Sequence, residues 1–237
     1  MRSYDCNNMI YCYVCSYINK YASEIYYGFN ALINHPSIKK QQYKILSIGC
    51  GDCADLFGIY HFITNNQLNI DISYTGIDIN TKWSLIHDKI KEIFANINFN
   101  FIYQNVFEYI ANQSTIDYNI IILEYVLNEI RKYTPDKIDE FIDSFARVIV
   151  DGLPSGALII INDINHNMVR DYFPKIRKCI EQNNKVLCFN LRFKTPSSHS
   201  YGGSVLPNDD LVFNTGHDTR FIEKGPCSSC LYIIHKQ

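Results

Sequence analysis

A glycine-rich turn is the part of this sequence whose residue types and spacing most clearly suggest chemistry. Residues 47–54 read Ser-Ile-Gly-Cys-Gly-Asp-Cys-Ala and join an apolar run, Lys44–Ile48, to a segment with helical spacing, Ala54–Thr64. Glycine lets the backbone turn tightly and lie close against a bound molecule. The helix after such a turn presents free N–H groups and the positive end of its dipole, which favour an anionic or carboxylate group. The turn therefore predicts a site for a nucleotide-like ligand.

Useful side chains also follow three further expected strands. These strands are expected at Ile72–Asp78, Ile97–Gln104 and Asp117–Leu123. Asp78 can accept hydrogen bonds from both hydroxyls of a ribose, and Asn105 with Val106 offers an amide and an apolar neighbour for an adenine. Glu124 and Tyr125 follow the last of the three strands. Because ligands of open α/β sheets bind at the carboxyl ends of the strands, we expect these residues to meet the glycine turn at one edge.

The elements that must position these residues alternate between strand and helix along the chain. Further helices are expected at Thr81–Asn96, Phe107–Asn112, Thr134 to about Val150, and Asn167–Gln182. Further strands are expected at Gly156–Asn162, Lys185–Lys194 and Ser229–Lys236. Thr134 is expected to cap its helix, with Pro135 in the first turn. The alternation predicts right-handed crossovers and a mostly parallel sheet, and the unbroken apolar runs at 120–123 and 158–161 favour strands covered on both faces.

Five segments resemble successive motifs of class I, Rossmann-like methyltransferases that use S-adenosylmethionine. They are KILSIGCGDCADLFG, YTGIDIN, FIYQNVFEY, NIIILEYVLNEI and GLPSGALIIIND, and together they cover about residues 44–165. The resemblance implies an α/β three-layer sandwich around a seven-stranded, mostly parallel sheet with the order 3-2-1-4-5-7-6 and an antiparallel last strand. We expect residues 1–43 to form an N-terminal helical cap, and residues 44–237 to form the methyltransferase domain with a long loop at 195–228.

The resemblance also implies S-adenosylmethionine as the cofactor. It assigns cofactor binding to Gly49, Cys50, Gly51, Asp78, Ile79, Asn105, Val106, Glu124 and Tyr125. The two glycines would lie under the methionine part, Ile79 would pack on the adenine, and Glu124 with Tyr125 would line the reactive side. The chain departs from the family at Ser47, where an acid is common, and at Cys53, which replaces the third glycine.

Two other functions fit parts of the pattern. A nicotinamide-dependent dehydrogenase would use a similar turn, and Ala54 supplies its usual third small residue. The 43 residues before Lys44 and the antiparallel final strand argue against that reading. A fold that binds the cofactor without catalysing methyl transfer, and acts as a regulator, is the second alternative.

General-base candidates come from two regions. Glu124 and Asp163 lie at strand ends, although either could instead contact the cofactor or cap a helix. His199 and His217 lie in the long loop, which we expect to reach the same edge, although loop histidines are more often simply solvated. No signature selects the acceptor atom, so the catalytic residues are not predicted beyond these four.

The N-terminal segment and the cysteines have structural explanations as well as functional ones. Tyr13, Tyr17 and Tyr21 recur every four residues, which predicts one helical face that packs on the main domain. Of three Cys-x-x-Cys pairs, the outer two could form a four-thiolate zinc site. These two pairs are Cys12 with Cys15, and Cys227 with Cys230. Free buried thiols are the simpler interpretation, so no metal is our main expectation.

Composition bounds the remaining functions. The chain has 237 residues and a formal charge of −2, so a strong electrostatic grip on nucleic acid is not indicated. No apolar run is long enough to span a membrane, and no signal peptide is recognisable, which predicts a cytoplasmic protein without a membrane partner. A small-molecule acceptor is slightly favoured, with RNA or protein as alternatives, and the oligomeric state is not predicted.

Overall fold

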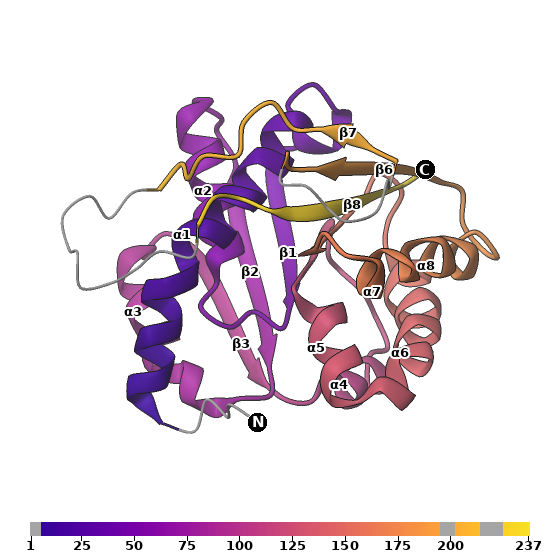
Figure 1. The fold of residues 1–237 in the computed structure, drawn as a ribbon, viewed down its shortest axis with the longest axis horizontal. Helices are drawn as coiled ribbons and strands as arrows, with labels where there is room; N and C mark the ends of the chain where they lie inside the picture. Colours follow the sequence, from indigo (N-terminus) through magenta and orange to yellow (C-terminus); the bar gives the residue numbers. More distant parts are fainter. Residues whose placement is uncertain (1–5, 195–201, 214–224) are drawn as a thin grey trace.

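An eight-stranded sheet forms the centre of the computed structural model, which describes residues 6–194, 202–213 and 225–237 (Figure 1). The strand order is β3-β2-β1-β4-β5-β8-β6-β7. The strands are β1 Gln42–Ile48, β2 Asp71–Asp78, β3 Asn98–Tyr103, β4 Ile120–Glu124, β5 Leu158–Ile164, β6 Val186–Arg192, β7 Ser204–Val205 and β8 Ser229–Lys236. Strands β1 to β5 run parallel, and β8 is antiparallel to both β5 and β6.

The expected mostly parallel sheet with an antiparallel last strand is confirmed, and β8 has the bounds that the sequence predicts. The strand count differs by one. Strand β7 consists of two residues that pair in parallel with β6 inside the segment expected as a loop. A two-residue strand has no alternating pattern long enough to detect in a sequence.

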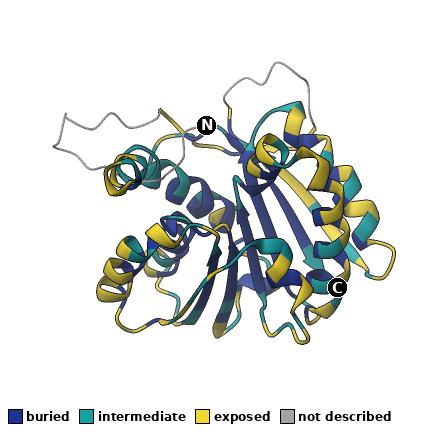
Figure 2. Ribbon diagram, turned by 90° about the horizontal axis from the view of Figure 1, so that it is seen from below, coloured by how far each residue is buried: buried dark blue, intermediate teal, exposed yellow. Residues whose placement is uncertain are grey.

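Helices cover both faces of the sheet and complete a three-layer α/β sandwich (Figure 2). The α-helices are α1 Asn7–Ala31, α2 Ala54–Asn65, α3 Ser84–Ile93, α4 Val106–Ala111, α5 Val126–Tyr133, α6 Ile138–Ser144, α7 Asn167–Arg170 and α8 Tyr172–Ile180. Shorter turns are η1 Pro36–Ile38, η2 Thr81–Trp83, η3 Pro135–Lys137 and the π-helical η4 Phe145–Val150. Side chains of α1, α2 and α3 share one buried cluster, and those of α4, α5, α6, η4 and α8 share the other.

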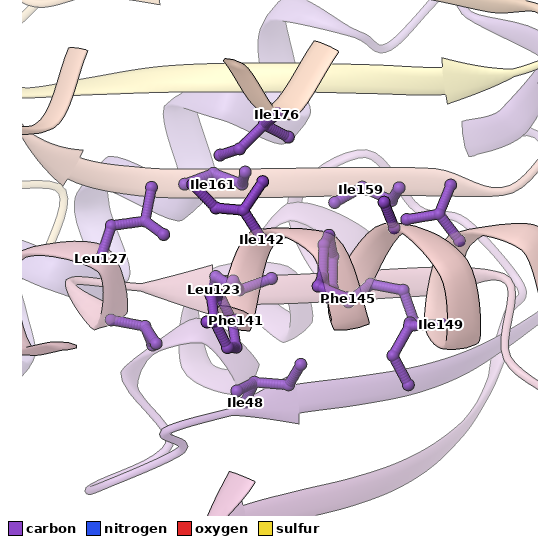
Figure 3. Close-up of a cluster of buried hydrophobic side chains, with 14 of the residues drawn as sticks. Ile48, Leu123, Leu127, Phe141, Ile142, Phe145, Ile149, Ile159, Ile161 and Ile176 are labelled. Atoms are coloured by element: carbon purple, nitrogen blue, oxygen red, sulfur yellow. The ribbon is translucent and has the colours of Figure 1, made fainter. Parts of the chain in front are cut away.

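The central strands are apolar at consecutive positions because both of their faces are covered. In β4, Ile120 and Ile122 belong to the cluster beneath α1 and α2, whereas Ile121 and Leu123 belong to the opposite cluster. Figure 3 shows this second cluster, in which strand side chains meet Phe141, Phe145 and other residues of the covering helices. The alternation decides which side chains face which helical layer, and the parallel direction of β1 to β5 places their carboxyl ends at one edge.

Three expected helices are interrupted. The segment expected as Thr81–Asn96 consists of η2 and α3. The segment after Thr134 consists of η3, α6 and η4, and the Thr134 hydroxyl donates to the Ile130 carbonyl at 3.2 Å. Thr134 makes no side-chain capping bond to η3, so the expected cap is wrong. The segment expected as Asn167–Gln182 is divided into α7 and α8 around Asp171.

Helix α1 lies directly against α2, and one glycine makes this approach possible. A Cβ atom added to Gly58 would lie 2.4 Å from the Ala22 carbonyl oxygen, closer than any side chain allows. Gly58 therefore lets the two helix backbones touch, which brings α1 across the sheet toward the strand ends. Within the described part of the chain, none of the helices is both long enough and apolar enough to span a membrane.

Candidate functional site

The turn between β1 and α2 has the backbone geometry that its glycines predict. Gly49 and Gly51 have φ angles of +68° and +46°. The Gly49 and Cys50 N–H groups donate to the Ile77 carbonyl at 2.8 and 3.0 Å, which binds the turn to β2. A Cβ atom on Gly49 would lie 2.9 Å from Val126 Cγ2. Only glycine fits there without strain.

Cys53 takes a left-handed conformation, φ +56°, at the N-terminus of α2. This is the position where the sequence departs from the glycine that such turns usually have. A non-glycine residue in this region costs free energy, so the surrounding structure must hold it in place.

A narrow pocket opens on this turn. It is lined by Tyr13, Tyr21, Ser47, Gly49, Cys50, Gly51, Asp52, Asp55 and Glu124. Its free volume is about 30 Å³, enough for a water-sized group. Strand ends and the glycine turn form one part of its wall, and two tyrosine rings from α1 form another. The structure thus brings Gly49, Gly51 and Glu124 together as the sequence predicts.

Three acids make this pocket electrostatically unusual, of which Asp52 and Asp55 are buried and Glu124 is partly exposed. Burial raises the pKa of Asp52 to about 7, raises that of Asp55, and raises that of Glu124 well above its usual range. One carboxylate oxygen of Asp52 and one of Asp55 are buried without a hydrogen-bond partner among the described residues. A positively charged ligand would compensate for the cost of ionising these groups. The pocket is therefore suited to a cation.

Asp78 lies at the end of β2 beside the same turn. Its Oδ2 atom accepts from the Gly51 N–H at 3.1 Å, and its Oδ1 atom accepts from the Asn80 N–H at 2.8 Å. Burial raises its pKa to about 6. Ile79, the next residue, leaves 66% of its surface exposed and so offers an apolar platform next to the carboxylate.

Asn105 and Val106 follow β3, the edge strand next to β2. Asn105 caps α4, because its Oδ1 atom accepts from the Phe107 N–H at 2.9 Å. Asp78 pairs with Tyr103 in the sheet, so Asn105 lies just beyond the carboxylate at the same edge. The side-chain oxygen of Asn105 is therefore already used to cap the helix. This role was not predicted from the sequence.

Glu24 of α1 is a central residue that the sequence prediction missed. It is fully buried, and its Oε2 atom accepts from the Tyr125 hydroxyl at 2.8 Å and from Asn162 Nδ2 at 3.1 Å. Its Oε1 atom accepts from the backbone N–H groups of residues 228 and 229 at 2.9 and 3.2 Å. Asn162 Nδ2 also donates to Glu124 Oε1 at 2.9 Å. One carboxylate thus ties α1 to the ends of β4, β5 and β8.

A sequence signal for Glu24 exists. Glu24 is the only acid in the segment Ala22–Phe29, which is otherwise apolar except for Ser23. A charged residue on a buried helical face is rare unless it has partners.

Aromatic rings form a continuous stack along α1 toward the pocket. Ring centroids are 4.9 Å apart for Tyr13 and Tyr17, and 5.3 Å apart for Tyr17 and Tyr21. Tyr21 stacks on Tyr125 at 4.2 Å, and Tyr13 meets the edge of Trp83 at 5.8 Å. The predicted tyrosine face therefore packs on the main body, and it does so over the candidate site.

Asp163, another general-base candidate, is not among the residues that line the pocket. Asp163 is fully buried, and its Oδ2 atom accepts from the Asn128 N–H at 3.1 Å while its Oδ1 atom accepts from its neighbour Ile164 at 2.7 Å. It therefore caps α5, and burial raises its pKa to about 7. His199 and His217 lie outside the residues that the structure describes.

The two outer Cys-x-x-Cys pairs do not converge. Residues 227–230 meet α1 near its middle, where Lys20 Nζ donates to the Ser228 hydroxyl at 2.6 Å. Cys12 and Cys15 lie five to eight residues earlier, roughly 8–12 Å along the helix axis. Cys12 is exposed, whereas Cys227 and Cys230 are buried. Among the described residues the three side chains that do converge in a metal-binding arrangement are Cys50, Cys53 and His87.

A wider groove lies away from the strand ends. It measures about 360 Å³ and is lined by Ala31, Leu32, Asn34, His35, Pro36, Phe189 and Leu191. Burial lowers the pKa of His35, so its imidazole stays neutral near pH 7. The groove lining contains no acid and no permanent charge, so we assign the chemistry to the smaller pocket.

Comparison with known proteins identifies the fold. No family model matches the chain, and no curated protein sequence matches it. Among solved structures, a protein from Listeria monocytogenes described as a candidate class I S-adenosylmethionine-dependent methyltransferase superposes with a TM-score of 0.53 at 13% identity, over 90% of this chain and 59% of that one. A candidate S-adenosylmethionine-dependent methyltransferase from Streptococcus mutans gives 0.50 at 17% identity, over 88% and 47%.

These similarities show that the chain has the class I methyltransferase fold, and that it spans about half to three fifths of the length of those two proteins. The strand order also separates it from dinucleotide-binding dehydrogenases. Their sheet has the order 3-2-1-4-5-6, whereas here the antiparallel strand β8 is inserted between β5 and β6.

Proposed function

We propose that this protein is an S-adenosylmethionine-dependent methyltransferase. The observation that carries the proposal is the acid-lined pocket on the β1–α2 glycine turn, at the strand ends of a class I methyltransferase fold. S-adenosylmethionine carries a positive sulfonium and a positive amino group. Both are opposite in charge to the ionised form of the carboxyl groups that line the pocket. It also carries a ribose, an adenine and a carboxylate, and the protein has groups beside the pocket that could bind each of these parts.

Each part of the cofactor has a proposed partner. The backbone of the turn and the N-terminus of α2 would receive its carboxylate. Asp52, Asp55 and Glu124 would face its amino and sulfonium groups. Asp78 would accept from the ribose hydroxyls, at the expense of one of its present backbone hydrogen bonds. The exposed Ile79 side chain and the start of α4 would contact the adenine.

The pocket must widen for a ligand of this size. A free volume of about 30 Å³ holds a water-sized group and not a nucleoside. Tyr13 and Tyr21 are the lining residues that come from α1, so an outward movement of these two side chains would widen the pocket. We therefore place the opening movement in the first half of α1, ahead of the Glu24 anchor.

When bound, the cofactor supplies a methyl group that is activated toward nucleophiles by the positive sulfur. The chain would hold the acceptor in line with that methyl group and exclude water from it. Glu124 is the proposed proton acceptor, because it lines the pocket and a bound cation beside it would favour its ionised form. Asp163 is less suited, since both of its oxygens accept backbone hydrogen bonds.

A small-molecule acceptor agrees best with the surroundings. Carboxyl groups line the pocket, and they repel the phosphates of RNA. Tyr13 and Tyr21 line the same space, with Tyr125 stacked on Tyr21, and these rings favour a compact, partly apolar molecule. RNA and protein acceptors remain the alternative outcomes of the assay below.

Isothermal titration calorimetry with S-adenosylmethionine and S-adenosylhomocysteine tests the binding step. We expect both to bind the wild-type protein and the control variant Asp88→Asn, whose altered side chain is exposed on α3. Asp78→Ala should weaken both ligands at least tenfold, which corresponds to about 1.4 kcal/mol. Absence of binding of both ligands to the wild-type protein would overturn the proposal.

A transfer assay then separates an enzyme from a non-catalytic regulator. A demethylated cell extract is incubated with the protein and a labelled methyl donor. Label in the low-molecular-weight fraction is expected. Label removed by ribonuclease or by protease would instead identify an RNA or protein acceptor, and binding without any transfer of label would identify a regulator.

A further inference from the structure

Two thiols and an imidazole converge beneath the glycine turn. Cys50 and Cys53 belong to the turn, and His87 lies on α3. All three are buried, and one donor atom from each lies within 4.8 Å of the others. Cys50 Sγ is 3.8 Å from His87 Nε2. The proposed function, on which this inference does not depend, uses the backbone of this turn and gives these three side chains no role.

We propose that Cys50, Cys53 and His87 bind one thiophilic metal ion of the Zn²⁺ class, which links the turn to α3. Two thiolates and one imidazole are a donor set that selects zinc or a similar soft ion over magnesium or calcium. Zinc bonds of about 2.3 Å to sulfur and 2.0 Å to nitrogen put tetrahedral donor atoms roughly 3.5–3.8 Å apart. The sulfur-to-nitrogen distance is already 3.8 Å, and adjustments of no more than about 1 Å bring the other donors into range.

The backbone already holds the two cysteines in a compact turn. The Cys53 N–H donates to the Cys50 carbonyl at 2.7 Å. The left-handed conformation of Cys53 is unfavourable for a residue with a side chain, so a function for its thiol would explain why glycine is absent. Gly76 of β2 leaves room for the other sulfur, since a Cβ atom there would lie 2.8 Å from Cys50 Sγ.

His87 directs one ring nitrogen toward the turn and the other toward the Tyr103 hydroxyl. Its ring stacks on Phe101 at a centroid distance of 3.9 Å. Its Nε2 atom lies 2.8 Å from the Gly51 carbonyl, and its Nδ1 atom lies 2.8 Å from the Tyr103 hydroxyl. Burial lowers the pKa of His87 to about 4, so the ring is neutral at pH 7. A neutral ring whose second nitrogen is hydrogen-bonded is the usual form of a histidine ligand.

Metal binding changes the protonation of the cluster in a defined way. Without metal, Nε2–H donates to the Gly51 carbonyl, and Nδ1 accepts from the Tyr103 hydroxyl. With metal, the Nε2 lone pair binds the ion, the ring proton moves to Nδ1, and Nδ1–H donates to the Tyr103 oxygen. Each thiol releases its proton to solvent. Three protein donors leave the fourth tetrahedral position for a water molecule.

The charges around the cluster favour a cation. Burial raises the pKa values of both thiols, and each thiol also interacts with the other. Asp55 and Asp78 contribute at Cys50, and Asp52 and Asp55 contribute at Cys53. Lys91 and Asp88 act on His87 with opposite signs. The acids around the turn thus place negative charge near the cluster, which favours a bound cation.

Titration of reduced, metal-free full-length protein with Co²⁺ and Zn²⁺ tests the site. We expect one equivalent of Co²⁺ to produce thiolate charge-transfer absorption in the near ultraviolet, and one equivalent of Zn²⁺ to abolish it. Cys53→Gly and His87→Gln should lose this absorption and bind Zn²⁺ at least tenfold more weakly. Cys179→Ser, which alters a distant thiol, should behave as wild type.

Cys53→Gly keeps the test interpretable, because glycine accepts the left-handed conformation and the variant should fold. Thermal unfolding of the metal-free variants checks this, and Zn²⁺ should raise the midpoint of the wild type alone. Failure of the wild type to bind one equivalent, or wild-type absorption in a folded Cys53→Gly variant, would overturn the proposal. S-adenosylhomocysteine binding by the metal-free protein is measured in parallel, so failure of this site is distinguishable from failure of the proposed function.

Discussion

Replacement of Glu24 by alanine should destabilise the protein more than any other single loss of a charge at the candidate site. The side chain is fully buried and accepts four hydrogen bonds, from Tyr125, Asn162 and the backbone of residues 228 and 229. Glu24→Ala leaves all four donors without this acceptor. An unsatisfied buried donor costs about 1–3 kcal/mol, and water can reach the partly exposed ones. We therefore expect a loss of about 3–5 kcal/mol.

Urea unfolding followed by circular dichroism measures this loss. A change of this size should lower the thermal midpoint by roughly 6–20 °C for a chain of this length. Tyr125→Phe removes one donor and should cost about 1 kcal/mol. The control is Glu92→Ala, an exposed acid on α3 paired with Lys89, which should cost less than about 1 kcal/mol. A loss below about 1 kcal/mol for Glu24→Ala would refute the view that this carboxylate anchors α1.

Three further predictions concern the turn, the titration of the pocket and the helix contact. Gly49→Ala should weaken S-adenosylhomocysteine binding at least tenfold in calorimetry, because the new Cβ atom would lie 2.9 Å from Val126 Cγ2. An unchanged affinity would contradict the close fit of this turn. Asp52 has a pKa of about 7 in the folded protein and roughly 3.9 in the unfolded chain. Between these two pH values the folded state binds more protons than the unfolded state. The free energy of unfolding should therefore fall as the pH rises from about 4 to 7. Urea unfolding at several pH values should show that Asp52→Asn flattens this fall, and an equally steep fall in the variant would be evidence against the assignment. Gly58→Val should cost more than about 3 kcal/mol, because its side chain would overlap the Ala22 carbonyl; a Gly58→Val protein of wild-type stability would show that α1 does not lie where the structure places it.

The sequence predicts the parts of the fold in which pattern and environment agree. Strand β8 has the expected bounds because an apolar run ends at the polar C-terminus, and α2 begins where the glycine turn ends. The order of the strands follows from the resemblance, whereas the alternation of strands with helices predicts only the mostly parallel sheet. Local hydrogen bonds decide the places where prediction fails. The Thr134 hydroxyl bonds backward to Ile130 instead of capping the next helix.

Residues of the candidate site could be predicted only where they stand at the end of a strand or directly after it. Asp78 and Glu124 follow their strands directly, so topology alone carries them to the pocket edge. Glu24 and His87 lie on helices, and their positions depend on how α1 and α3 pack, which no short motif encodes. The outer cysteine pairs illustrate the same limit, because ligand spacing within each pair says nothing about the distance between the pairs.

A crystal structure of the protein with S-adenosylhomocysteine would test the central claim most directly. The account predicts the ribose hydroxyls within hydrogen-bond distance of the Asp78 carboxylate, and the amino group of the ligand facing Asp52 or Glu124. It also predicts that the Tyr13 and Tyr21 rings leave the pocket. A ligand bound elsewhere, with the glycine turn and Asp78 untouched, would contradict it.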